Sequence, residues 1–188
     1  MNFSIVRFIT HFRIAALGII AFIVLSCENK TDLIPKSDFL TLPSITDKEF
    51  VTVFTDSGQV ELVLSSPLLE QYDNKDNSYT EFRSGMKVIF HDGKKEPVGS
   101  VTSKYAKYTK ANNLWELRDS VIVINEKNDK LETEVLFWNQ QSDLIYTDRF
   151  VKITNQEEII QGFGFESDSR LRKRKIKKVN AIIYLKDE

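Results

Sequence analysis

From residue 50 onward, the chain is a succession of short segments in which β-branched and aromatic residues alternate with polar ones. A period of two is typical of strands with one buried face, and the intervening Gly, Asn and Asp residues favour turns. The pattern therefore predicts an all-β domain with short strands in meander order. The expected strands cover residues 50–55, 59–65, 79–82, 86–91, 98–103, 104–109, 114–118, 120–125, 130–138, 144–147, 150–154, 158–162 and 176–185.

Three stretches of the chain resemble one another: residues 117–125, 144–153 and 159–165 each pair two extended pieces across a polar or glycine-containing corner. Such units cannot bury their own apolar face, so they favour a stacked or rolled sheet with one shared interior. An ordinary β-sandwich, with chance similarity between its hairpins, fits the spacing as well. Only residues 68–72 allow a short helix.

An ordered series of motifs runs through the centre of the chain: KYAKY at 104–108, LWELRDSVIVINE at 114–126, LETEVLFWN at 131–139, IYTD at 145–148 and GFGFESD at 162–168. This series resembles the LptC family, the membrane-tethered periplasmic proteins of lipopolysaccharide export, over about residues 50–179. Asp119 stands where the family pattern usually has glycine. We therefore expect a left-handed backbone at this corner, which Asp tolerates better than most residues.

The resemblance implies a twisted, V-shaped β-jelly roll of the OstA-like type, open along one side, with an apolar groove as its interior. Such a slot suits an acylated glycolipid, because each methylene exposed to water costs about 0.8 kcal/mol. The implied role is a component of the export machinery that receives lipopolysaccharide or lipooligosaccharide from an inner-membrane ABC transporter. It would then pass the lipid to a soluble periplasmic bridge protein of the same jelly-roll type.

Period-two alternation supplies the candidate groove residues. A bulge near Glu134 and Val135 is expected, because Leu131 and Leu136 lie on opposite faces unless the strand slips by one residue. For each candidate, ordinary core packing is the alternative to lipid contact. The candidates are the apolar members of the central strands: Leu117, Val121, Val123, Leu131, Phe137, Ile145, Val151, Ile153 and Ile160.

The family resemblance also places partner contacts at the sheet edges, with the bridge protein at the C-terminal edge and the transporter at the N-terminal edge. Edge-to-edge backbone pairing would extend one groove into the next. The candidates in the last strand are Ile182, Ile183 and Tyr184. The chain has no Gly-rich phosphate loop, so the energy would come from the transporter.

The N-terminus has the features of a lipoprotein signal. Arg7 and Arg13 precede an apolar run at 14–25, and Ser26 and Cys27 follow it, so residues 24–27 resemble a bacterial lipobox. We expect a signal peptide at 1–26, a lipid anchor on Cys27 with a polar tether through residue 47, and a carrier domain at 48–188, held on the inner membrane facing the periplasm. An uncleaved membrane helix is the alternative, although a span needs roughly 20 apolar residues. A buried thiol is the other alternative.

The net charge and one basic segment indicate which partners the chain could bind. Removal of residues 1–26 takes away two arginines and no acidic residue, so the formal net charge moves from -1 to -3. Seven cations lie between Arg170 and Lys178, and they favour a solvated loop or edge strand. Attraction to lipid phosphates or an anionic membrane is the alternative, whereas a nucleic-acid partner is not expected.

No catalytic pattern is evident. His91 is the single histidine after residue 26, and no cysteine or second histidine accompanies it for a metal site. No nucleophile elbow of the Gly-x-Ser-x-Gly type occurs. The sequence therefore predicts a protein that is not an enzyme and needs no cofactor. The competing hypothesis is a β-sandwich envelope lipoprotein that binds glycans or scaffolds a complex.

Overall fold

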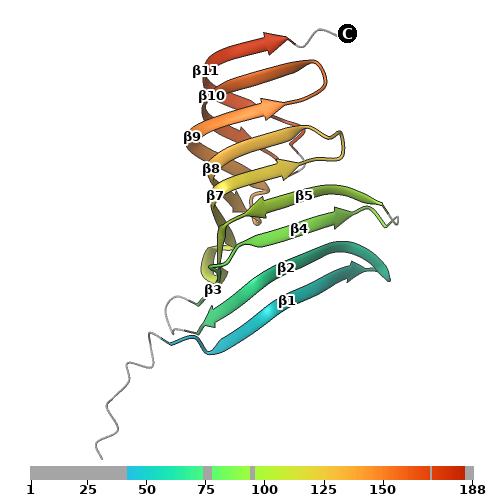
Figure 1. Cartoon of the computed structure of the whole chain (residues 1–188), viewed down its shortest axis with the longest axis vertical. Helices are drawn as coiled ribbons and strands as arrows, with labels where there is room; N and C mark the ends of the chain where they lie inside the picture. Colours follow the sequence, from blue (N-terminus) through green and yellow to red (C-terminus); the bar gives the residue numbers. More distant parts are fainter. Residues whose placement is uncertain (1–41, 74–77, 94–95, 170, 185–188) are drawn as a thin grey trace, which may run out of the picture. The chain divides into compact units, whose positions relative to one another are not determined.

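The computed structural model describes residues 42–73, 78–93, 96–169 and 171–184. Within these residues the chain is almost entirely strand, and all strand pairs are antiparallel. The expected all-β, jelly-roll-like fold is confirmed (Figure 1). The elements are β1 (Ile45–Asp56), β2 (Gln59–Tyr72), β3 (Tyr79–Phe82), β4 (Met86–His91), β5 (Pro97–Ser103), β6 (Tyr105–Thr109), the 3₁₀ turn η2 (Lys110–Asn112), β7 (Leu114–Ile124), β8 (Lys130–Asn139), β9 (Leu144–Thr154), β10 (Glu158–Ser167) and β11 (Lys175–Tyr184).

The sheet is a meander of strands that bend at a corner. β2 pairs with β4 through its first half and with β3 through its second half, while β7 pairs in the same way with β6 and β5. Thus β3 and β4 act as one long strand interrupted at Gly85, and β5 and β6 as another interrupted at Lys104. Gly85 has φ +95°, and a Cβ there would lie 3.0 Å from the carbonyl oxygen of Ser103, so this corner requires glycine.

The corners of the later strands contain residues with a left-handed backbone conformation and shifts of strand register. Asp119 and Ser120 of β7 have φ of 61° and 55°, which confirms the left-handed backbone expected at Asp119. The β8–β9 register shifts between Thr133 and Phe137, where a bulge of β8 was expected, but the additional residue belongs to β9. Gly164, with φ 74°, marks the corresponding break in β10. In β8 and β10 the irregularity moves the following side chains to the opposite strand face. In β7 the two left-handed residues instead leave Leu117 and Val121 on the same face, and both halves of each bent strand direct apolar residues inward.

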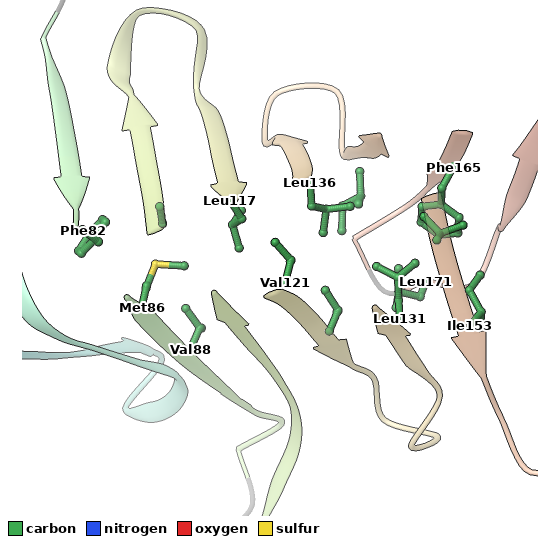
Figure 2. Packing of buried hydrophobic residues seen from close by; sticks show 14 of the residues in the cluster. Phe82, Met86, Val88, Leu117, Val121, Leu131, Leu136, Ile153, Phe165 and Leu171 are labelled. Atoms are coloured by element: carbon green, nitrogen blue, oxygen red, sulfur yellow. The ribbon is translucent and has the colours of Figure 1, made fainter. Parts of the chain in front are cut away.

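The bend divides the sheet into two facing walls. Wall A comprises β4, β5 and residues 59–65, 121–124, 130–133, 150–154 and 158–163, and wall B comprises β3, β6 and residues 68–72, 114–118, 136–139, 144–147 and 165–167. Figure 2 shows Met86, Val88 and Val121 of wall A pointing toward Phe82, Leu117 and Leu136 of wall B. These side chains belong to one continuous hydrophobic cluster, the interior between the walls.

Several expected element boundaries were wrong. Residues 68–72 are not helical, because they form the second half of β2 and pair with β3. Residues 114–118 and 120–125 were expected as two strands, yet they join in β7, and residues 144–147 and 150–154 join in β9. The corner residues lie within these strands because the backbone turns there without a separate loop. β1 begins at Ile45, before the expected end of the tether.

Candidate functional site: an apolar interior between two walls

A continuous row of branched aliphatic side chains crosses wall A. Each strand contributes one residue to this row, and it stands directly opposite the row residue of the neighbouring strand. Residues that stand opposite each other share one face of the sheet. The row therefore follows the interior from β2 to the last strand without a polar interruption. In spatial order its members are Leu64, Val88, Val101, Val123, Leu131, Ile153, Ile160 and Ile182.

Wall B presents a second row to the same interior. Phe82, Ala106, Leu117 and Leu136 stand opposite one another on β3, β6, β7 and β8. Thr147, Phe165 and Ile176 continue the row on β9, β10 and β11. Neither row contains a residue that is charged at neutral pH. The site is consequently an apolar layer bounded by backbone, with charged side chains on the outer faces.

Most of the predicted groove residues lie in this interior. Ile160 is half-buried and shares the wall A row, and seven others of the set are buried. The buried members are Leu117, Val121, Val123, Leu131, Ile145, Val151 and Ile153. Their contact with a lipid stays a prediction.

Phe137 lies elsewhere. It stands on the outer face of wall B, where its ring stacks on Tyr146 with centroids 5.2 Å apart. The alternation of β8 shifts by one residue between Thr133 and Leu136, so Leu136 takes the interior position that we assigned to Phe137. A shift in this part of β8 was expected, but the alternation alone did not fix the residue at which it occurs.

The middle of the interior is packed with side chains. Val121, Val151 and Phe165 are each 0% exposed. The buried hydroxyl of Thr133 donates to the carbonyl oxygen of Phe150 at 2.8 Å, and that of Thr147 accepts from the N–H of Arg149 at 3.1 Å. These two hydroxyl groups are thus used by the backbone at the corners. An entering apolar ligand would have to separate the walls or displace side chains.

The alternation pattern missed several interior residues. Phe82, Met86, Ala106, Leu136 and Phe165 are buried in the cluster but follow or precede corners, where the period of two is interrupted. Leu171 is also buried, although it lies in the connection between β10 and β11. Corner glycines and the doubled apolar residues of β8 were the available signals for the first group. No local pattern marks Leu171.

Charged networks occupy the outer face of wall B. The hydroxyl of Tyr105 donates to Glu81 at 2.9 Å, and Arg83 contacts both Glu81 at 2.8 Å and Glu70 at 2.9 Å. Burial of the ring, together with the hydrogen bond to Glu81, raises the pKa of Tyr105. These contacts link β2, β3 and β6 from outside, so the interior needs no polar group to join them.

The basic segment is partly neutralised. Arg172 lies 3.3 Å from Asp168, Arg174 lies 3.0 Å from Asp129, and Lys177 lies 2.7 Å from Glu166. The hydrogen bond and charge of Lys177 lower the pKa of Glu166. Three cations of the segment therefore have carboxylate partners in the fold, which accords with a structural role for these three.

The terminal strands β1 and β11 expose apolar side chains. On β11, Ile182, Ile183 and Tyr184 are 47%, 50% and 74% exposed. On β1, Val51, Val53 and Phe54 are more than half exposed. The predicted edge residues are thus accessible, and their use by a partner remains a prediction.

Two further features concern the membrane and metals. Across the described residues, no helix is long and apolar enough to cross a membrane. Nor do His, Cys, Asp and Glu side chains gather there in a group that could hold a metal ion. Cys27, the expected signal peptide and most of the expected tether lie outside the described residues.

A meander of bent antiparallel strands around one apolar interior defines an all-β, jelly-roll-like protein. No curated protein matches the chain. Residues 14–184 match the model of the family described as lipopolysaccharide-assembly, LptC-related, and the chain belongs to this family. Its members are periplasmic components of lipopolysaccharide transport and are not known as enzymes.

Proposed function

We propose that this protein carries lipopolysaccharide or lipooligosaccharide between walls A and B, from an inner-membrane ABC transporter to a soluble periplasmic bridge protein. The observation that carries the proposal is the aliphatic row of wall A. It runs from Leu64 to Ile182 on the last strand, where the side chain is 47% exposed. An acyl chain could follow this row to the end of the sheet while remaining covered.

The way in which the walls are joined supports entry from the side. At the corners the walls are connected by the continuous backbone of the bent strands. Between the walls, by contrast, the interior is held by side-chain packing. Separating the free ends of the walls would therefore leave the strand ladders intact. Buried lipid would then replace the lost contacts between side chains, since both are apolar.

The transfer step would use the exposed terminal strands. β11 offers Ile182, Ile183 and Tyr184 to an incoming strand of the bridge protein, and pairing of the two edges would join the two interiors. The opposite end, β1, would meet the transporter through Val51, Val53 and Phe54. Each of these assignments extends the family role to particular strands of this chain.

Anchoring completes the proposal. Cys27 would carry the lipid after removal of residues 1–26, and the residues between Cys27 and the start of β1 at Ile45 would act as a tether on the periplasmic side of the inner membrane. A lipid anchor contributes no helix to the transporter. Docking would then depend on β1, so Val51→Glu with Val53→Glu should reduce lipopolysaccharide export in cells more than Cys27→Ala does. The reverse ranking would show that the anchor dominates.

A photocrosslinking pair tests the carrier function directly. Trp138 and Phe137 are adjacent aromatic residues on opposite faces of β8, and neither is fully buried. A benzophenone amino acid in place of Trp138 should crosslink to lipopolysaccharide in cells, and the same group in place of Phe137 should not. Crosslinking from Phe137 alone, in cells whose export continues, would show that the lipid does not travel in the interior.

A further inference from the structure

The connection between β10 and β11 enters the interior. Leu171, in this connection, is 3% exposed and belongs to the hydrophobic cluster. Figure 2 shows its side chain among Leu131 and Ile153 of wall A and Phe165 of wall B. A loop residue thus fills space between the two walls, near the end of the sheet that carries the exposed last strand.

The backbone of Leu171 is held in an unfavourable conformation. Its φ is 55°, in the left-handed region that leucine rarely adopts. Its N–H donates to the carbonyl oxygen of Asp168 at 3.0 Å. Such a residue persists where surrounding contacts compensate for the strain. Burial of the side chain is the evident compensation, so Leu171 is held in place by its apolar neighbours and would be released if they moved.

The same connection is fastened to itself through Asp168. One carboxylate oxygen of Asp168 accepts hydrogen bonds from the N–H groups of Arg172 and Lys173, at 2.6 and 3.1 Å. The side chain of Arg172 approaches the other oxygen at 3.3 Å. These contacts fold the segment into a compact turn with Leu171 at its centre.

Two more contacts attach the connection to the free ends of both walls. Arg174 donates to Asp129 at 3.0 Å, and Asp129 lies in the turn between β7 and β8, at the free end of wall A. The N–H of Ser169 donates to Asp143 at 3.3 Å, in the turn between β8 and β9 at the free end of wall B. The connection therefore spans the side of the interior that lies away from the corners.

We propose that the described part of residues 168–174 is a strap across this side of the interior, and that Leu171 is a specificity-determining residue occupying the place of an acyl chain. This inference rests on the proposed carrier function. When lipid enters, Leu171 leaves the interior and the Arg174–Asp129 ion pair opens. The strap then limits which acyl chains of the lipid reach the last strand. To do so, an acyl chain must replace the side chain of Leu171 among Leu131, Ile153 and Phe165.

A closed strap has a measurable consequence. If only the open form admits lipid, the apparent dissociation constant equals the intrinsic constant divided by the open fraction. Changes that favour the open form must therefore strengthen binding, although they remove native contacts. Removing a native contact ordinarily weakens ligand binding or leaves it unchanged. An increase in lipid affinity on removing a contact therefore identifies a strap.

The ion pair offers a charge-reversal test in the full-length protein. Arg174→Glu should increase hydrogen exchange of the amides in 171–174 without lipid, and it should strengthen binding of purified rough-type lipopolysaccharide about threefold or more. Combining it with Asp129→Arg should restore both slow exchange and the original affinity. Unchanged exchange in Arg174→Glu, or faster exchange with unchanged affinity, would overturn the proposal.

A matched pair of leucine truncations tests Leu171 itself. Leu171→Ala should strengthen lipopolysaccharide binding, whereas Leu136→Ala should not, although the two leucines are equally buried at 3% and 2% exposure. Equal effects on affinity would show that Leu171 is only a core residue. Crosslinking from position 138 separates the strap proposal from the proposed carrier function. If lipid crosslinks there while the strap variants leave affinity unchanged, the strap proposal is wrong and the carrier function stands. If lipid does not crosslink there, the carrier function is itself contradicted.

Discussion

Trp115 on β7 and Trp138 on β8 lie directly opposite each other on the interior face of wall B, and both indole N–H groups are buried without a hydrogen-bond partner in the described part of the chain. Unpaired buried donors carry a desolvation cost of about 1–3 kcal/mol each. They are the only tryptophans of the chain. Within the described residues, these two donors and the buried hydroxyl of Ser103 are polar groups of the interior without a hydrogen-bond partner.

Replacing either indole by a phenyl ring should cost little stability. Trp115→Phe or Trp138→Phe removes an unpartnered donor while leaving a smaller apolar ring, so we expect the free energy of unfolding to change by no more than about 1 kcal/mol. Truncation to Ala should cost about 3–5 kcal/mol. Urea denaturation measures both. A Phe variant as unstable as its Ala counterpart would mean that the N–H group is paired in solution.

Two neighbouring residues test which side chains of β9 face the interior. Val151 is 0% exposed in the interior, and Phe150 is 41% exposed on the outer face, where its ring meets Phe163 at 5.4 Å. Val151→Asp should lower the free energy of unfolding by about 3 kcal/mol or more, because it buries a charge without a partner. Phe150→Asp should cost about 1 kcal/mol through loss of the ring contact. Similar losses would contradict the assigned faces.

The corner of β7 depends on backbone conformation. Asp119 has φ 61°, and a β-branched residue is strained there. Asp119→Val should therefore lower the free energy of unfolding by about 1–3 kcal/mol, while Asp119→Gly should change it by about 0.5 kcal/mol at most. Asp148→Val is the matched control, because Asp148 lies at the corner of β9 without a positive φ. Equal losses for the two valine variants would exclude the conformational cause.

The connection around Asp168 should respond to acid. Burial alone would raise the pKa of Asp168, but hydrogen bonds from the N–H groups of Lys173 and Arg172 outweigh it and hold the pKa below 3.8. A lowered folded-state pKa contributes stability above the unfolded-state pKa, and this stability is lost as the pH falls through the folded value. Below about pH 4 the protein should therefore lose stability.

Asp168→Asn checks this contribution. The amide can still accept hydrogen bonds but carries no charge, so part of the decrease in melting temperature between pH 6 and pH 3 should disappear. Thermal unfolding of both proteins across this range measures the difference. Parallel curves for wild type and variant would show that Asp168 does not contribute.

Much of the fold could be predicted because period-two alternation is a local property. The strands of walls A and B and seven buried groove candidates follow directly from it, as Val121, Val123, Val151 and Ile153 illustrate. The corner at Asp119 was also predictable, from its place in the family pattern and the tolerance of Asp for a left-handed backbone. These features depend on residues that are close together in the chain.

Phe137 and Leu171 show where this reasoning stops. Both residues are apolar, and the sequence around each of them does not indicate whether its side chain points into the interior or outward. The side that Phe137 occupies depends on where the register between β8 and β9 shifts. Leu171 is buried because Asp129 and Asp143, distant in sequence, hold its connection over the interior.

The sequence alone therefore determined the all-β class, the order of the strands and the apolar character of one face. Tertiary structure alone decided how the two walls meet and which side chains share the interior, because the corner of β8 inverts the alternation whereas the corner of β7 preserves it. It also decided the strap, whose position follows from an ion pair between Arg174 and Asp129. Contacts across 45 residues leave no periodic trace in the chain.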